Sequence, residues 1–336
     1  MTVRPRLLAL LRCPRCRGKL AAATFVQSPN DEAVVDGVLT CRCGERYPIV
    51  DTIPRMLPNA FAMFPEFTDR YRERLGGVPG AASRLARGKF ERQLDRTRES
   101  FGTPDLFRGQ LGLDAGCGSG RHIYHAAACG TEMVGMDFSR AIDSTQRNTR
   151  HLRHVHLVQG DIYAPPFAEG AFDFVYSIGV LHHLPDPARG LRALTPLLRP
   201  GGSIFIWVYS RNRRVVNLLL EIVRTATTRL PYALVNALSF VGAAVDQYCF
   251  VLPYRALRRI PKAGPLIDAL MFPRVKMYSA YPFAVLHADW FDRLAAPIRF
   301  YYSEEEVERF VQEAGISDVK VTPTGLYGWR ANGVRR

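Results

Sequence analysis

Residues 111–120 have the sequence Leu-Gly-Leu-Asp-Ala-Gly-Cys-Gly-Ser-Gly, an apolar stretch that runs into a turn with almost no side chains. The stretch predicts the end of a buried strand, followed by a glycine loop whose backbone amides can approach a ligand closely. The dinucleotide fingerprint G-x-G-x-x-G does not fit, because its third glycine would fall on Arg121. The sequence therefore predicts a nucleotide-like ligand but not a nicotinamide dinucleotide.

Two acidic residues follow at the ends of two further predicted strands. Asp137 ends the stretch 132–137, about 20 residues after the loop, where a mononucleotide-binding half places its ribose-binding carboxylate. Asp161 follows a strand predicted from residue 156. More strands, predicted over 171–180 and 203–208, alternate with helices. This alternation predicts an α/β fold with a doubly wound sheet.

The series Asp-x-Gly-x-Gly-x-Gly, Asp137 and Gly160-Asp161-Ile162 resembles the motifs of class I S-adenosylmethionine-dependent methyltransferases. The resemblance implies a Rossmann-like, seven-stranded and mostly parallel sheet that binds S-adenosylmethionine. It implies that Asp137 takes the ribose hydroxyls, that Asp161 accepts from the adenine amino group, and that the Ile162 amide meets the ring edge. The residues implied to bind the cofactor are Asp114, Gly116, Gly118, Gly120, Asp137, Asp161, Ile162 and Ser177.

Asp114 and Asp137 also have simpler interpretations. Asp114 could stabilise the start of the following helix, since acidic groups favour helix N-termini without any ligand. Asp137 on its own would be an ordinary acid at the end of a strand.

His182 and His183 follow the fourth predicted strand, where a methyl acceptor would lie. A sulfonium methyl group is already activated, so the main catalytic task is to hold the acceptor in line with the breaking bond. A general base is needed only when the acceptor still carries its proton at neutral pH. His183 is the first candidate for that base and His182 the second, and either imidazole could instead shape the pocket.

The first four cysteines form two close pairs, Cys13-Pro14-Arg15-Cys16 and Cys41-Arg42-Cys43. Four thiolates on two turns suit a tetrahedral, structural zinc ion. With the stretch 39–57, the pairs resemble the zinc-ribbon family that activates tRNA methyltransferases. The C-x-C pair is one residue shorter than the usual C-x-x-C, so free cysteines in a ribbon without metal are the alternative.

These motifs predict three segments. Residues 1–58 would form the zinc ribbon, 59–104 a helical linker, and 105–336 the methyltransferase domain. A largely helical insertion is expected over 209–299, where the family normally has a short connection. An insertion of that size usually has a function.

The formal net charge of +14 is concentrated in two places. Residues 1–20 carry six basic residues and no acid, and residues 208–264 carry nine basic residues against two acids. Such charge attracts RNA, an anionic membrane surface or an acidic substrate, and charge alone does not choose between them. The first residues lack the apolar region of a signal peptide, so we expect a cytoplasmic protein.

Residues 230–252 contain a single charge, Asp246, within the insertion. A buried helical lid is the first expectation for this stretch. The alternatives are an interfacial surface that contacts the inner face of a membrane and a helix that spans it.

The function predicted from these features is methyl transfer to a small or lipid-like acceptor, such as a phenol, a quinone precursor or a secondary metabolite. The first alternative is an RNA methyltransferase acting on ribosomal RNA or tRNA, which the ribbon and its basic residues would suit. The second is a scaffold that binds S-adenosylmethionine without catalysis.

Overall fold

The computed structural model describes residues 3–29, 34–64, 66, 108–212, 214–262, 264–325 and 327–336. The described residues belong to two compact units. The first contains the chain up to Ser210 together with Tyr301–Arg336, and the second contains Arg211–Phe300. The breaks fall beside the ends of the predicted insertion 209–299. Most of the predicted helical linker, from residue 67 to 104, lies outside the described residues.

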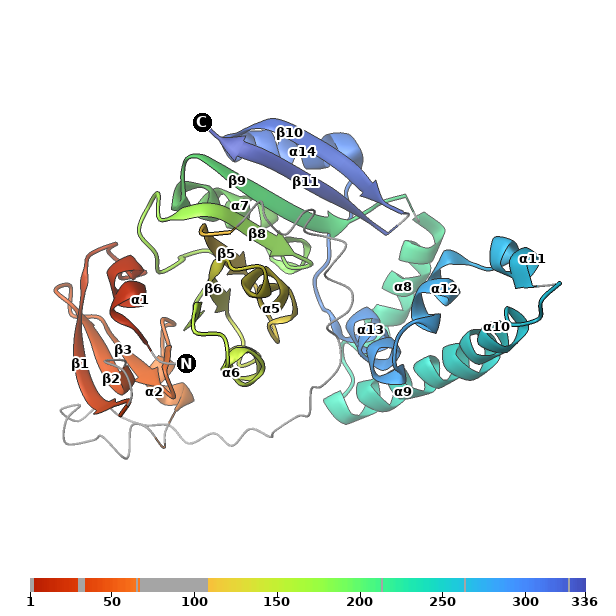
Figure 1. Cartoon of the computed structure of the whole chain (residues 1–336), viewed down its shortest axis with the longest axis horizontal. Helices are drawn as coiled ribbons and strands as arrows, with labels where there is room; N and C mark the ends of the chain where they lie inside the picture. Colours follow the sequence, from red (N-terminus) through yellow and green to blue (C-terminus); the bar gives the residue numbers. More distant parts are fainter. Residues whose placement is uncertain are drawn as a thin grey trace. The chain divides into compact units, whose positions relative to one another are not determined.

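A seven-stranded sheet forms the centre of the first unit (Figure 1). Its strands are β5 (Leu111–Ala115), β6 (Glu132–Asp137), β7 (Val155–Gln159), β8 (Phe172–Ile178), β9 (Leu198–Tyr209), β10 (Ile316–Thr324) and β11 (Gly328–Arg335). Their order is β10-β11-β9-β8-β5-β6-β7. The pairs from β9 to β7 are parallel, whereas β11 runs antiparallel between β9 and β10. The predicted fold class is confirmed.

Helices cover both faces of this sheet. One face is covered by α5 (Arg121–Ala128) and α6 (Ile142–Thr149). The other face is covered by α7 (Pro187–Leu194) and α14 (Glu304–Glu313). Successive side chains of a strand point to opposite faces, so Phe174 of β8 joins the first layer and Val175 joins the second. The sheet is therefore buried on both faces, as a parallel sheet requires.

A smaller antiparallel sheet at the N-terminus corresponds to the predicted ribbon. Its strands lie in chain order, and two short helices flank them. The elements are α1 (Pro5–Leu10), β1 (Leu20–Gln27), β2 (Val34–Cys41), β3 (Arg46–Val50), β4 (Ile53–Pro54) and α2 (Ala60–Met63).

The ribbon and the large sheet share backbone hydrogen bonds and one apolar core. The Met56 amide donates to the Gln159 carbonyl at 2.7 Å, beside a bridge between Arg55 and Gln159. Because β7 is an edge strand, this bridge covers backbone groups that would otherwise be open. Leu7 and Leu11 of the ribbon belong to the same buried cluster as the side chains of α7. Ribbon and sheet are thus one structural unit.

Arg55 is the buried polar centre of this contact. Its side chain is 1% exposed, and its guanidinium lies 2.6 Å from the Asp143 carboxylate of α6 and 3.2 Å from the Gln159 side-chain oxygen. The guanidinium also lies over the Phe64 ring, 4.4 Å from its centre. Burial lowers the pKa of Arg55, and Asp143 opposes that shift by stabilising the charged form. A buried cation with a carboxylate, an amide oxygen and an aromatic face is well compensated.

Replacing Arg55 by methionine should destabilise the first unit. The change removes the buried cation beside Asp143 and leaves that carboxylate with Arg140 alone among the described residues, at 3.3 Å, and removing one partner of a buried pair costs about 3–5 kcal/mol. Arg150→Met, at an exposed position at the end of α6, is the matched control and should stay within about 0.5 kcal/mol of the wild type. Urea unfolding followed by circular dichroism measures both. Equal losses for the two variants would contradict the assignment.

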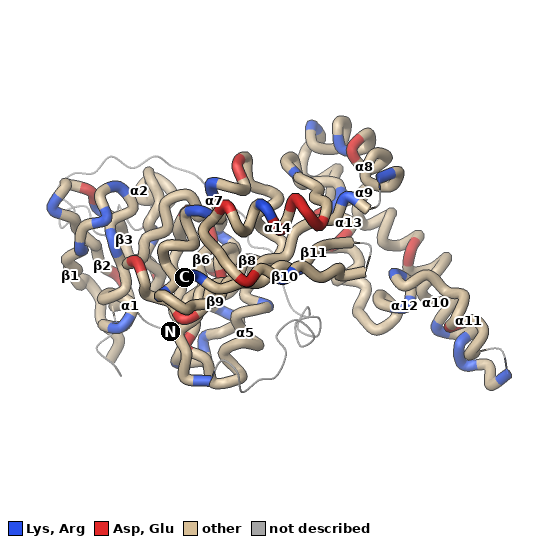
Figure 2. Tube along the Cα trace, turned by 90° about the horizontal axis from the view of Figure 1, so that it is seen from above, with Lys and Arg blue, Asp and Glu red and all other residues tan. Residues whose placement is uncertain are grey.

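Helices joined by short turns and loops make up the described residues of the second unit. Its elements are α8 (Arg214–Thr227), α9 (Tyr232–Asp246), the π-turn η5 (Gln247–Val251), α10 (Leu252–Leu257), α11 (Gly264–Leu270), α12 (Pro273–Ser279) and α13 (Phe283–Ala295). Figure 2 marks Lys and Arg residues near the α10–α11 end of this unit. The helix Tyr232–Leu257 is long and apolar enough to cross a membrane, and only 22% of its most apolar window is buried. The prediction that this stretch is a buried helix is therefore wrong.

Candidate functional site

The three predicted glycines of the β5–α5 loop all have positive φ angles, +92° at Gly116, +54° at Gly118 and +89° at Gly120. A Cβ atom on Gly116 would lie 2.4 Å from Val180, and one on Gly120 would lie 2.6 Å from Thr145. A Cβ atom on Gly118 would have no neighbour within 4 Å. The outer two glycines are therefore required for packing, and the middle one turns bare backbone toward open space.

Helix α6 holds this loop through side chains. The Thr145 hydroxyl donates to the Gly118 carbonyl at 2.6 Å, and the Asn148 amide donates to the Ser119 carbonyl at 2.9 Å. The same helix carries Asp143, the partner of Arg55. A continuous set of contacts therefore connects the ribbon to the glycine loop through one helix.

The predicted ribose acid, Asp137, lies beside the loop at the tip of β6. Its carboxylate accepts from the Gly118 amide at 2.7 Å and from the Ser139 amide and hydroxyl at 2.8 and 2.6 Å. Asp161 lies next along this edge, since the Gly160 amide donates to the Asp137 carbonyl at 3.0 Å. Both carboxylates are half-buried. The structure thus brings the middle of the loop and the two predicted acids together.

The Asp114 side chain lies beneath the loop. It is 1% exposed, and hydrogen bonds with the Tyr176 hydroxyl and with the Ile123 amide in the first turn of α5 lower its pKa. Burial outweighs both and raises the pKa of Asp114 to about 8. This position corresponds to the alternative in which Asp114 stabilises the helix start, so direct contact of its side chain with the cofactor is not what this geometry favours.

Two other predicted cofactor residues also have buried side chains. The Ser177 hydroxyl is completely buried and donates to the Ala115 carbonyl at 2.8 Å, so it fastens β8 to β5 instead of facing a ligand. The Ile162 side chain belongs to the apolar core, which leaves its backbone amide as the group available to an adenine ring. Sequence motifs locate such residues along the chain but do not specify which way their side chains point.

Aromatic rings gather where β8 and β9 end. His182 and His183 form a short 3-10 helix, η3 (Leu181–His183), and the ring centre of Tyr209 lies 4.0 Å from that of His182 and 5.6 Å from that of His183. Tyr209 also stacks on Tyr301 at 5.9 Å, and Trp207 lies 5.5 Å from Tyr209. The His183 amide donates to the Val180 carbonyl, and Val180 in turn packs against Gly116. The cluster therefore adjoins the glycine loop.

The two histidines differ in their surroundings. His182 is completely buried, and neither of its ring nitrogens has a hydrogen-bond partner among the described residues. Burial, with a smaller effect of His183, lowers the pKa of His182 well below 6.5. A neutral imidazole without access to solvent is a poor place to leave a proton, so His182 lines the cluster. His183 is partly exposed, and it remains the candidate base.

The sequence interpretation missed Trp207, Tyr209 and Tyr301. Trp207 and Tyr209 are two residues apart on β9, the spacing that places side chains on one face of a strand. This spacing in the sequence indicates a pair of aromatic rings at the end of that strand. Tyr301 follows the insertion by sequence, and only the fold brings it to Tyr209.

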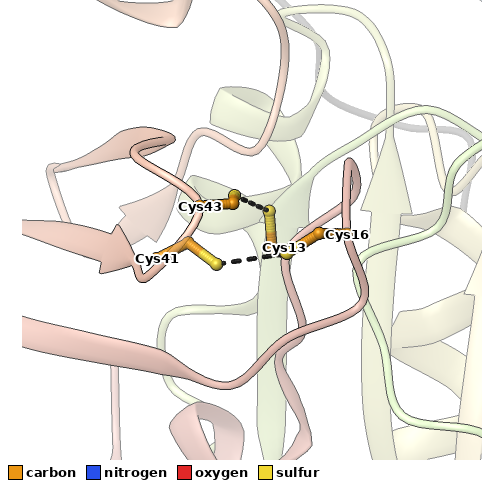
Figure 3. A group of neighbouring side chains, drawn as sticks. All are labelled: Cys13, Cys16, Cys41 and Cys43. Atoms are coloured by element: carbon orange, nitrogen blue, oxygen red, sulfur yellow. Dashed lines mark hydrogen bonds between the residues drawn. The ribbon is translucent and has the colours of Figure 1, made fainter.

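The four predicted zinc ligands converge in the ribbon (Figure 3). The sulfur atoms of Cys13, Cys16, Cys41 and Cys43 all lie within 4.8 Å of one another, with Cys13 and Cys43 at 3.7 Å and Cys16 and Cys41 at 3.4 Å. Zn–S bonds of about 2.3 Å in a tetrahedron suit such separations. The shorter C-x-C turn therefore supplies two ligands as well as the C-x-x-C turn does.

The surroundings of Cys13 favour a thiolate, whereas at Cys41 and Cys43 a backbone hydrogen bond is outweighed by burial and by neighbouring thiols, which raise the pKa of Cys43 and raise that of Cys41 to about 12. Burial raises the pKa of Cys13, but hydrogen bonds from the Tyr47 hydroxyl and from the backbone at Cys16 and Arg15 outweigh burial and lower the pKa to about 7. A Cβ atom on Gly18 would lie 3.2 Å from the Cys16 sulfur and 3.4 Å from the Cys41 sulfur. The donor set and the space around it fit a structural zinc ion with four protein ligands.

The purified protein should contain zinc, and Cys13→Ser should remove it. Loss of one thiolate from a four-ligand structural site weakens both metal binding and the fold that depends on it. Cys249→Ser changes an exposed cysteine in the second unit and is the matched control. Plasma mass spectrometry measures the metal, and thermal unfolding measures stability. Equal zinc content in the two variants would contradict the site.

Comparisons with known proteins agree with the two-part organisation. Residues 113–206 match a family model described as a methyltransferase domain, and residues 4–51 match a model described as Trm112p-like protein. The chain contains a methyltransferase domain preceded by a Trm112p-like domain, so the predicted resemblance is confirmed.

Individual relatives match over limited lengths. The ubiquinone biosynthesis O-methyltransferase of Pseudomonas paraeruginosa is 35% identical over 31% of this chain and 46% of that protein. The demethylmenaquinone methyltransferase of Staphylococcus haemolyticus is 34% identical over 29% of this chain and 42% of that protein. The chain therefore spans less than half the length of these two relatives. A solved SAM-dependent methyltransferase from Aquifex aeolicus aligns over 69% of this chain and 86% of its own, with 14% identity and a TM-score of 0.41.

The cofactor that this domain implies is S-adenosylmethionine. The bare Gly118 backbone and the half-buried Asp137 and Asp161 carboxylates at neighbouring strand tips fit such a ligand, because they combine close approach with acceptors for hydroxyl and amino groups.

Asp137→Ala should weaken S-adenosylmethionine binding by at least about tenfold, since each lost hydrogen bond to a charged group costs about 1.5–3 kcal/mol. Glu169→Ala removes an exposed carboxylate elsewhere in the same unit and should leave the affinity unchanged. Isothermal titration calorimetry measures both variants. An Asp137→Ala protein with wild-type affinity would refute this cofactor site.

Proposed function

We propose that this protein transfers a methyl group from S-adenosylmethionine to a small or lipid-like acceptor with an aromatic ring, such as a phenol or a quinone precursor. The observation that supports this proposal is the position of the aromatic cluster. It adjoins the glycine loop through Val180, at the edge of the sheet where Asp137 and Asp161 also lie. Ligands of doubly wound folds bind at this carboxyl edge.

Each group has a role in this proposal. Asp137 and Asp161 would hold the cofactor in the open space beside Gly118, and the cofactor supplies an activated methyl group when bound. The rings of Tyr209 and His183 orient a flat acceptor, since offset and edge-to-face contacts with aromatic rings are favourable. With a phenolic acceptor, His183 would take the phenolic proton, and the methyl group that the bound cofactor supplies would replace that proton on the oxygen.

RNA is the second candidate acceptor, which the match to the Trm112p-like model favours. Against it stand the arginines of residues 1–20, which are engaged within the protein. Arg17 donates to the carbonyls of Pro165 and Phe167, and Arg15 pairs with Glu45. Other donors of this kind are Arg4, Arg6 and Arg12. These bonds count only partly against RNA, since the Arg6 and Arg15 side chains are still 57% and 71% exposed and surface ion pairs are weak.

The relatives named for ubiquinone biosynthesis and for demethylmenaquinone support an acceptor with an aromatic ring.

We also propose that the protein acts in the cytoplasm, where S-adenosylmethionine is available as a soluble donor.

Cell extract incubated with the protein and methyl-labelled S-adenosylmethionine tests the acceptor class. Label in the organic fraction is expected, because the cluster suits an apolar ring. Label in RNA would overturn the proposed acceptor, and no transfer despite cofactor binding would support a non-catalytic scaffold.

His183→Ala should lower kcat by about 10²-fold or more with a phenolic acceptor, the usual contribution of a positioned base, and leave cofactor affinity unchanged. His151→Ala, an exposed histidine beyond α6, is the control and should retain wild-type kcat. Steady-state kinetics with the acceptor found in the extract measures both. Full activity in His183→Ala would remove this residue from the mechanism.

A further inference from the structure

Exposed apolar side chains are concentrated in the helical unit Arg211–Phe300. Among the described residues, all but two of the exposed large hydrophobic side chains lie in this unit, the exceptions being Val26 and Phe138. Soluble monomers rarely expose apolar patches larger than a few hundred Å², and larger ones mark interaction sites. The concentration of these side chains in one unit therefore points to an interaction site.

In helix α8 the buried face is polar and the exposed face is apolar, which is the reverse of the usual arrangement in a water-soluble protein. Its packed face is polar: the Arg224 guanidinium donates to the Arg293 carbonyl of α13 and pairs with Glu221 at 2.8 Å, and the Thr227 hydroxyl donates to the Leu294 carbonyl at 2.8 Å. Its apolar face is exposed instead, with these side chains: Val215, Val216, Leu218, Leu219, Ile222 and Val223.

Helix α9 shows the same inversion. It packs on α13 through small residues, since Ser239 and Ala243 are completely buried and a Cβ atom on Gly242 would lie 2.7 Å from Trp290. Asp246 accepts from the Trp290 ring nitrogen at 2.8 Å, so its charge is also turned inward. The exposed side chains are apolar: Tyr232, Leu234, Leu238, Phe240, Val241 and Val245.

Small residues between helices, polar groups satisfied inside and apolar groups outside are the arrangement that helices adopt in contact with lipid. In water the opposite arrangement is favoured, because burying each large apolar side chain contributes about 1.5–3 kcal/mol. The two helices therefore fit an acyl-chain environment better than an aqueous one.

The charge of the unit is complementary to anionic headgroups. Residues 211–300 contain thirteen Lys and Arg against five Asp and Glu, a net charge of +8. Glu221, Asp246, Asp268 and Asp289 are bonded within the unit. Exposed basic residues flank the apolar helices at their ends: Arg211, Arg214, Arg229, Arg258, Arg259 and Lys262. Basic residues next to inserted apolar faces are the pattern of interfacial membrane binding.

The connections of the unit argue against a single membrane crossing. The chain enters the unit after Ser210 and leaves it before Tyr302, and these two residues form a bridge in the first unit. Both ends must therefore lie on the same side of a bilayer, which requires an even number of crossings. Among the described residues, Tyr232–Leu257 is the one helix long and apolar enough to cross.

We propose that the helical unit Arg211–Phe300 binds the surface of an anionic lipid bilayer, with the exposed faces of α8 and α9 among the acyl chains and the flanking arginines at the headgroup phosphates. The cytoplasmic leaflet, which carries the anionic lipids, is the surface that this charge fits. Membrane binding of this kind does not require methyl transfer, so it stands apart from the proposed function.

Flotation of the full-length, zinc-containing protein with vesicles tests this proposal. The wild type should float with vesicles of phosphatidylcholine and phosphatidylglycerol, and less with phosphatidylcholine alone. The double variant Leu218→Glu/Ile222→Glu should lose at least about tenfold in binding, because two exposed apolar contacts are replaced by charges. Val26→Glu makes the same kind of change at an exposed position of the first unit and should bind like the wild type.

The basic residues have a separate readout. Arg258→Glu/Arg259→Glu should weaken binding to the anionic vesicles by about fivefold or more per residue, with little change for phosphatidylcholine alone. Circular dichroism shows whether each variant is folded, and calorimetry with S-adenosylmethionine shows whether it binds the cofactor. A loss of vesicle binding can therefore be distinguished from a failure of the proposed methyltransferase function. The proposal is overturned if the wild type does not float, or if the double variant floats equally well. It is also overturned if sedimentation shows a stable dimer that needs Leu218 and Ile222.

Discussion

The buried guanidinium of Arg55 is the interaction on which the first unit depends. It lies at the junction of the ribbon and the sheet, where the edge strand β7, the helix α6 and the aromatic ring of Phe64 meet. A charge this deeply buried is tolerated only when its partners are fixed in place. The ribbon therefore cannot shift on the sheet without exposing or unpairing that charge.

This constraint reaches the cofactor site through α6. Asp143 of α6 forms the ion pair with Arg55. Thr145 and Asn148 of the same helix donate hydrogen bonds to the carbonyls of the glycine loop. The cysteine cluster lies in the ribbon that carries Arg55, so the cluster, the ribbon and the glycine loop belong to one series of contacts. A Trm112p-like domain in the same chain as a methyltransferase domain thus supports the cofactor loop from within the molecule.

The sequence predicted the parts that short motifs encode. The glycine loop lies with Asp137 and Asp161, and the four cysteines converge separately in the ribbon, because each group is fixed by a local turn or a strand end. Side-chain direction was not predictable in this way, and Asp114, Ser177 and His182 are buried instead of facing a ligand. Arg55 and Tyr301 act over long sequence distances that no motif records. The stretch 230–252, which contains α9, was misjudged as a buried helix, since hydropathy alone does not show which face packs.

Hydrogen–deuterium exchange with and without S-adenosylhomocysteine tests the central claim, that the loop and the strand tips supported by α6 form the cofactor site. The account predicts slower exchange on ligand addition at residues 116–122 and 137–141 and around Asp161, with α6 protected to a smaller degree. Unchanged exchange in these segments, or protection confined to the helical unit Arg211–Phe300, would contradict it.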